Sequence, residues 1–295
     1  MTSRVASLAA FALALQIATA SAAPDGAPVD ASGNEKEDAG WTLYFDNDTL
    51  TPVQRDEDYT GGIAVTLAGR RAKDSWLSLD GPLGWLDRLL LDDASNGTFQ
   101  LHSIQVGALA FTPGNIKQAE VREGDRPYAS LLYVANGRSY VRDAGRTVYH
   151  TSLSVGLLGT QIVPEFQDAF HSAIGANKPK GWDHQISDSG EPTIRYTLTR
   201  QDLALSGHAA GNTDYEIKHS VAGSVGYLTE GSVALSWRWG RINKPWWAGP
   251  PDRVEYIAEP APATGGSTHK LGVRELYVWG GIKAHARLYK SFLQG

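Results

Sequence analysis

Long segments of this chain alternate between apolar and polar residues, and the polar positions include full charges. In residues 282–290 one face carries Ile, Ala, Ala and Leu, and the other carries Lys, His, Arg and Tyr. Residues 216–227 and 232–239 repeat the arrangement. Successive side chains of a strand point to opposite faces, so the pattern predicts strands with one apolar face. Such alternation over about ten residues is typical of a strand in an outer-membrane barrel.

A soluble β-sandwich whose polar face meets water would alternate in the same way, so the strands alone leave both folds open. The N-terminus favours export. Arg4 precedes an apolar run from Val5 to Ile17, and small residues follow at Ala20 and Ala22. This run is too short to span a membrane as a helix and is typical of a secretory signal peptide. We therefore predict a signal peptide over residues 1–22 and a flexible leader over residues 23–40, where Pro, Asp, Gly, Ser, Asn and Glu occur without periodicity.

Composition excludes several classes of protein. The chain has no cysteine, which rules out disulfides and thiolate metal sites. Its net charge is −5 and it has no basic run, so we expect no nucleic-acid partner. No apolar run after residue 22 reaches the length of a spanning helix. A membrane-embedded form would therefore be an antiparallel transmembrane β-barrel, and the fold class that we predict is all-β.

We expect about nine strands and one short loop helix near residues 164–175. The strands are expected near residues 41–47, 59–69, 98–112, 129–142, 145–158, 192–204, 214–228, 231–242 and 271–290. Bacterial single-chain barrels have an even number of strands. We therefore expect the barrel domain, residues 41–295, to be incomplete at its C-terminus. Four tryptophans are expected either in an interfacial girdle or in the core: Trp237, Trp239, Trp246 and Trp247.

The expected helix places two functional side chains four residues apart. Gln167 and His171 lie on one helical face and can converge on one small target. Phe166, Phe170 and Ile174 form an adjacent apolar stripe. The spacing is compatible with a catalytic site, but a single histidine on a half-buried helix can equally be a packing or capping residue.

Four motifs, taken in order, resemble one family. They are Phe45-Asp46-Asn47-Asp48, Asp58-Tyr59-Thr60-Gly61-Gly62, Gly124-Asp125-Arg126-Pro127-Tyr128-Ala129, and Gln167 with His171 followed by Gly181-Trp182-Asp183-His184-Gln185. Together they resemble the outer-membrane lipid A 3′-O-deacylases. The resemblance implies a calcium-dependent esterase that acts on lipid A of lipopolysaccharide, and we expect the protein to be a monomer. It also implies a twelve-stranded barrel, of which this chain would lack about three strands, with a site between the wall and a loop helix near the outer surface.

The resemblance also implies roles for individual residues. Asn47 and Asp48 match the family's Asn-Asp pair, which serves the active site and its cation. Thr60 matches a hydroxyl residue of the site, and Gln167 and His171 match the helix pair, with the histidine as catalytic base. The sequence departs from the pattern at Asn177, where at least one family member has a site glutamate. Because calcium takes six to eight oxygen ligands, loss of this carboxylate should weaken calcium binding unless other oxygens compensate.

The residues themselves are consistent with ester hydrolysis. The unperturbed pKa of histidine, about 6.5, lets neutral His171 take a proton from water near neutral pH. A cation held by Asn47 and Asp48 would polarise the ester carbonyl. No Gly-x-Ser-x-Gly motif is present, which argues against a serine hydrolase.

Several of these positions also have structural interpretations. The Asn47-Asp48 segment could cap a strand into a turn. Arg126 could pair with a carboxylate near the turn that Pro127 fixes, or it could contact a lipid A phosphate together with Lys117. Two other functions remain open: a non-catalytic outer-membrane barrel that has lost the site, and a soluble exported β-sandwich that binds glycans through its tryptophans.

Overall fold

The computed structural model describes residues 19–21, 34–47, 61–91, 99–120, 125–174, 178–187, 189–209, 211, 213–242, 245–248 and 276–293. Its strands are β1 (Thr19–Ser21), β2 (Gly40–Asn47), β3 (Gly61–Ala68), β4 (Phe99–Phe111), β5 (Ala129–Arg142), β6 (Thr147–Leu158), β7 (Glu191–His208), β8 (Asp214–Gly226), β9 (Leu228–Arg241) and β10 (Leu276–Lys290). Its α-helices are α1 (Arg71–Asp74), α2 (Asp80–Leu91) and α3 (Ile162–Ile174).

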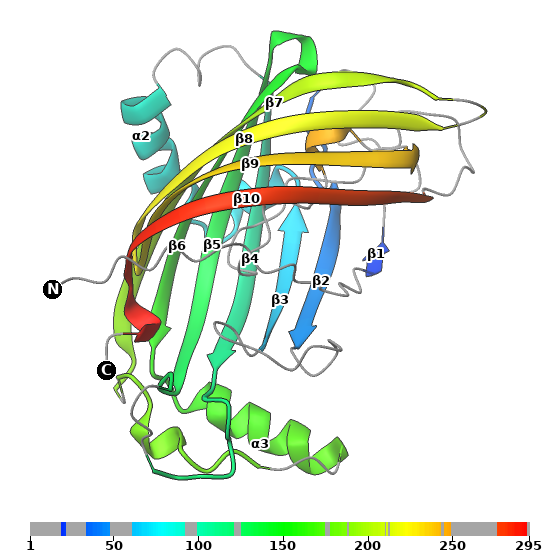
Figure 1. The fold of residues 1–295 in the computed structure, drawn as a ribbon. Helices are drawn as coiled ribbons and strands as arrows, with labels where there is room; N and C mark the ends of the chain where they lie inside the picture. Colours follow the sequence, from blue (N-terminus) through cyan, green and yellow to red (C-terminus); the bar gives the residue numbers. More distant parts are fainter. Residues whose placement is uncertain are drawn as a thin grey trace, which may run out of the picture.

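The strands form one antiparallel sheet in which every strand pairs with its neighbours in the chain, from β1 to β10. The sheet curls into a half-barrel (Figure 1). The nine predicted strands are confirmed as β2 to β10. One curled sheet is not a sandwich of two sheets, which removes the sandwich alternative.

The structure describes one segment of the predicted signal peptide and one segment of the predicted leader. The short strand β1 pairs with β2 and lies within the predicted signal peptide. Residues 23–33 lie outside the described residues. From Asn34 onward the predicted leader contacts the sheet, because the buried Glu35 carboxylate accepts a hydrogen bond of 2.5 Å from the His102 backbone N–H.

The pairing register separates an apolar face of the sheet from a polar one. Val65 and Val134 both pair with Val106, and their row of side chains faces outward; Val65 and Val106 are each 44% exposed. The next row faces inward and contains Thr66 and Gln105. Gln105 is fully buried and donates to the Thr66 hydroxyl at 2.8 Å. The sheet is therefore apolar outside and polar inside, as the alternating sequence predicts.

The inner face carries two apolar clusters, one near each end. At the end where β4 meets β5, the ring of Phe111 stacks on that of Phe292 with centroids 4.3 Å apart. At the other end, Trp246 and Trp247 are each 7% exposed and pack with Leu101 and Val148. These two tryptophans are therefore core residues.

Trp237 and Trp239, the other two tryptophans for which a girdle or a core position was expected, lie on the outer face of the sheet. Trp237 and Trp239 on β9 are 46% and 49% exposed. Strand alternation places both on the same face as Leu235, which is 54% exposed. Of the four tryptophans, these two have the position of an interfacial girdle.

The two longer helices lie at opposite ends of the sheet (Figure 1). The predicted loop helix is confirmed as α3, in the connection between β6 and β7. Helices α1 and α2, in the connection between β3 and β4, were not predicted. No helix among the described residues is both long and apolar enough to cross a membrane.

Candidate functional site

Helix α3 is held against the outer face by a small apolar cluster. Val163, near the start of the helix, packs with Tyr128 and Trp182, and the cluster rests on Ala108 and Ala110 of β4. The rings of Tyr128 and Trp182 are 4.9 Å apart between centroids. Small alanines on the strand let the helix and its loop approach the wall closely. The cluster fixes α3 beside the wall at the end of β4.

The cluster also orients one member of the predicted helix pair. The Trp182 indole N–H donates a 2.9 Å hydrogen bond to the side-chain carbonyl of Gln167. This bond occupies the amide oxygen and leaves the amide N–H groups to donate elsewhere. His171 follows one turn later and is half-buried. The structure thus confirms that both predicted residues lie on one helix, four positions apart.

Of the other residues predicted to serve catalysis or the cation, only Asn47 can be placed relative to α3. Asp48, Thr60 and Asn177 lie outside the described residues. Asn47 is the last residue of β2, and its backbone pairs with Gly61, which pairs in turn with Ala110. Because Ala110 supports the α3 cluster, the row that ends in Asn47 runs directly to the helix anchor.

One candidate residue was not identified from the sequence. Asp168 lies next to Gln167 on α3, and its Oδ1 atom is buried without a hydrogen-bond partner. Burial of a carboxylate oxygen is costly unless a cation or a donor satisfies it. Its spacing of three residues from His171 could have identified it, since i and i+3 are neighbours on a helix.

An open pocket lies beside the helix anchor. It is shallow, and Asn115, Arg126, Tyr128 and His184 are among the residues that line it. Arg126, predicted to bind substrate, therefore faces a pocket. Lys117 is exposed in the same loop, where its backbone N–H donates to the Asn115 side chain at 3.1 Å.

The tyrosine shared by the anchor and the pocket remains neutral. Burial raises the pKa of Tyr128, and hydrogen bonds to the backbone of Gly181 and Lys180 oppose that rise. The neutral hydroxyl donates to the Ile116 carbonyl at 3.3 Å. Tyr128 therefore connects the pocket loop to the wall.

Among the described residues, no group of three His, Asp or Glu side chains is arranged to hold a metal ion. The Asp168 carboxylate, which was not among the predicted calcium ligands, is a single oxygen donor of this region. The side chains of Asn47 and Asp48 do not belong to the described part.

Comparisons with known proteins agree with the motifs. The family model described as outer membrane protein LpxR matches residues 7–295. The structure is similar to LpxR from Salmonella typhimurium, with a TM-score of 0.62 and 15% sequence identity over 86% of this chain and 79% of that one. No curated protein sequence matches the chain. With nine long strands in a curled antiparallel sheet and a family match over nearly its whole length, the chain belongs to the LpxR family of outer-membrane proteins, the lipid A deacylase family that its motifs predicted.

Proposed function

We propose that this protein is an outer-membrane esterase that removes an ester-linked acyl chain from lipid A. The observation that carries the proposal is the position of α3. Its Gln167 and His171 lie on a helix held against the outer, lipid-facing surface of the wall, next to the strand row that ends in Asn47. A substrate that is itself a membrane lipid can reach such a site from the bilayer.

His171 is proposed as the general base that takes a proton from the attacking water. Base catalysis by a positioned side chain contributes on the order of a hundredfold to ten-thousandfold in rate. Gln167, whose carbonyl is held by the Trp182 indole, can use its amide N–H groups to orient water or the substrate carbonyl. Thr60, directly before Gly61, is proposed as a further hydrogen-bonding group of the site.

One oxygen donor of this region supports a calcium site. Asp168 offers a buried carboxylate oxygen that has no hydrogen-bond partner, and calcium prefers such ligands. We propose that Asp168 acts with Asn47 and Asp48 and supplies the charge that Asn177 lacks. When bound, the cation would polarise the ester carbonyl and stabilise the developing negative charge.

The basic residues at the pocket beside the anchor suit a phosphate group of the substrate. Arg126 lines it, and the exposed Lys117 lies in the same loop. Guanidinium and ammonium groups both bind phosphate, arginine often through two parallel hydrogen bonds. This arrangement would hold the head group while an acyl chain lies against the apolar wall.

The test compares two histidine variants of the refolded protein in detergent with calcium. His171→Ala should lower the rate of fatty-acid release from lipid A by at least about a hundredfold. His208→Ala is the matched control, because His208 is 87% exposed at the other end of the sheet and should keep the wild-type rate. Equal rates in a folded His171→Ala protein would disprove the assigned base. A wild-type protein that releases no fatty acid would favour a non-catalytic barrel.

A further inference from the structure

The outer wall of the barrel carries polar side chains where a lipid-facing wall should be apolar. Val134 pairs with Val155, and both belong to the outward row. Alternation places Asn136, Arg138 and Tyr140 on the same face of β5, further toward its end. Charged substitutions on the lipid face of a barrel are destabilising. These residues must therefore be shielded from lipid.

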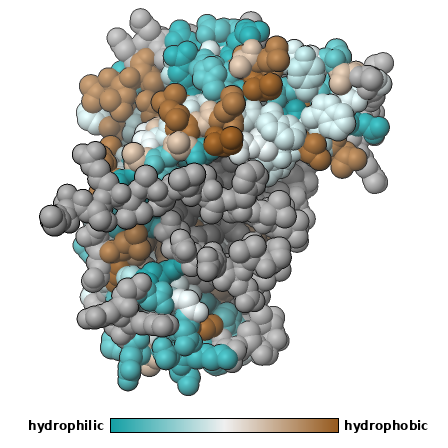
Figure 2. Space-filling view, in the orientation of Figure 1, coloured by the Kyte–Doolittle hydropathy of each residue, from teal (hydrophilic) through white to brown (hydrophobic). Residues whose placement is uncertain are grey.

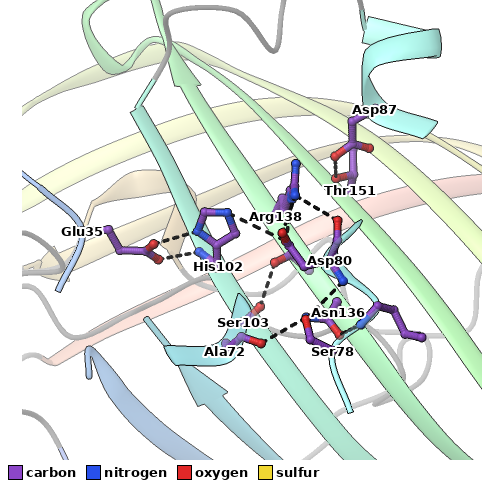
Figure 3. Close-up of polar contacts among 12 residues, drawn as sticks. Glu35, Ala72, Ser78, Asp80, Asp87, His102, Ser103, Asn136, Arg138 and Thr151 are labelled. Atoms are coloured by element: carbon purple, nitrogen blue, oxygen red, sulfur yellow. Dashed lines mark hydrogen bonds and ion pairs between the residues drawn. The ribbon is translucent and has the colours of Figure 1, made fainter. Parts of the chain in front are cut away.

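Helix α2 provides the shield (Figure 3). Asp80, at its first position, accepts two hydrogen bonds from the Arg138 guanidinium, at 2.6 and 2.5 Å. About two turns further on, the fully buried Asp87 accepts hydrogen bonds from three hydroxyl groups of the wall. The donors are Tyr140 at 2.6 Å, Thr151 at 2.9 Å and Tyr196 at 3.0 Å. The polar groups of wall and helix thus satisfy one another.

The opposite side of α2 is apolar and exposed. Trp85, Leu89 and Leu90 are 59%, 66% and 54% exposed, and Trp76 just before the helix is 90% exposed. In Figure 2, hydrophobic residues gather at the upper left, where Figure 1 places α2. The helix therefore presents its polar groups to the barrel and its large apolar side chains outward, the reverse of a helix on a water-facing surface.

This apolar surface continues the lipid-facing band of the wall. A band about 25 Å tall takes about ten residues of a tilted strand. On β9 the outward residues from Val233 to Trp239 are all about half exposed, whereas on β6 only Val155 and Leu157 are exposed outward, at 40% and 42%. Leu153, next in that row, is only 3% exposed. The band on β6 is too short without α2.

Basic residues flank the exposed apolar side chains. Arg70 and Lys73 precede Trp76, and Arg88 lies between Trp85 and Leu89; all three basic residues are exposed. Amphipathic helices with aromatic and leucine side chains on one face and basic residues at its border lie in membrane interfaces. Long basic side chains can reach lipid phosphates while their stems stay apolar.

We propose that α2 is embedded in the membrane and that its outward side chains contact the acyl chains of diacyl phospholipids. The helix completes the lipid-facing surface of β5–β7, and Arg70, Lys73 and Arg88 meet the phosphate groups. The assignment to the phospholipid leaflet rests on the proposed function, in which α3, at the other end of the sheet, faces the lipid A leaflet. The contact with acyl chains does not depend on that function.

The absence of cysteine permits a direct test. Single-cysteine variants Leu89→Cys, Val155→Cys and His208→Cys carry a nitroxide spin label in phosphatidylcholine vesicles, which contain no lipid A. Collision with oxygen, which concentrates in the bilayer, is compared with collision with a water-soluble nickel chelate. The labels at Leu89 and at the lipid-facing control Val155 should both collide mainly with oxygen. The label at His208 should collide mainly with the nickel chelate, as expected in water.

Two results would overturn the proposal. A label at Leu89 that responds mainly to nickel would place α2 in water. A label protected from both reagents would show that protein, and not lipid, covers the helix. Because Leu89 is exposed, its replacement should not impair folding, and circular dichroism of each variant verifies this. Neither result depends on esterase activity, so failure here is distinguishable from failure of the proposed function.

Discussion

Removal of one partner from the ion pair beneath α2 should destabilise the folded protein by several kcal/mol. The side chains of Arg138 and Asp80 are only 12% and 5% exposed. The guanidinium also donates to the Asp80 backbone carbonyl at 2.9 Å. Removal of one partner from a buried pair leaves an uncompensated charge and costs about 3–5 kcal/mol. We therefore expect Arg138→Met to lower the free energy of unfolding by about that amount, measured by urea titration in phospholipid vesicles.

A double variant separates the charge from the packing. Asp80→Asn combined with Arg138→Met removes both charges, so it should recover much of the stability lost in Arg138→Met alone. A cost below about 1 kcal/mol for Arg138→Met would equal that of an exposed ion pair and would refute the reasoning. An equal cost for the single and double variants would show that packing, and not the unpaired charge, is responsible.

Three further changes test the site and its loop. Trp182→Phe keeps a ring against Tyr128 but removes the donor to Gln167, so steady-state kinetics should show kcat lower by about five- to tenfold, the value of one hydrogen bond; an unchanged kcat would show that the bond does not position Gln167. Asp168→Asn should abolish the rise in Tm that calcium produces in the wild type, and an equal rise in both would exclude Asp168 as a ligand. Gly159→Ala should destabilise the loop that carries α3 by more than about 1 kcal/mol, because Gly159 has a φ of +73° and a Cβ would overlap the Ser187 carbonyl; hydrogen exchange in α3 measures this, and unchanged protection would contradict it.

The strands could be predicted because their pattern is local. In residues 228–241, outward and inward side chains alternate, and the exposed fraction alternates with them. Predicted boundaries of 231–242 and 271–290 compare with the observed β9, Leu228–Arg241, and β10, Leu276–Lys290. Alternation also explains which tryptophans face outward, whereas Trp246 and Trp247 lie in a connection where no periodicity applies.

Helix α2 was not predicted because contacts with residues distant in the sequence stabilise it. Gly81, Pro82 and Gly84 within five residues are typical of a turn. Gly84 is nevertheless needed in the helix, because a Cβ there would lie 2.5 Å from the Arg138 guanidinium. The glycine lets the helix approach a charge that lies 54 positions later in the chain. No local pattern encodes that contact.

The candidate site also combines features that the sequence predicts with features that only the tertiary fold determines. The spacing of Gln167 and His171 on a helix is visible in the sequence. The hydrogen bond from Trp182 and the unpaired oxygen of Asp168 depend on how the following loop folds back onto the wall, which spacing does not determine.

The central claim is tested most directly by mass spectrometry of lipid A incubated with the refolded wild-type protein, with calcium and with a chelator. If the protein is the proposed esterase, lipid A incubated with calcium should lose the mass of one ester-linked acyl chain and keep its amide-linked chains. The chelator should prevent this loss. Lipid A that stays intact with calcium in the presence of a folded barrel would contradict the assignment.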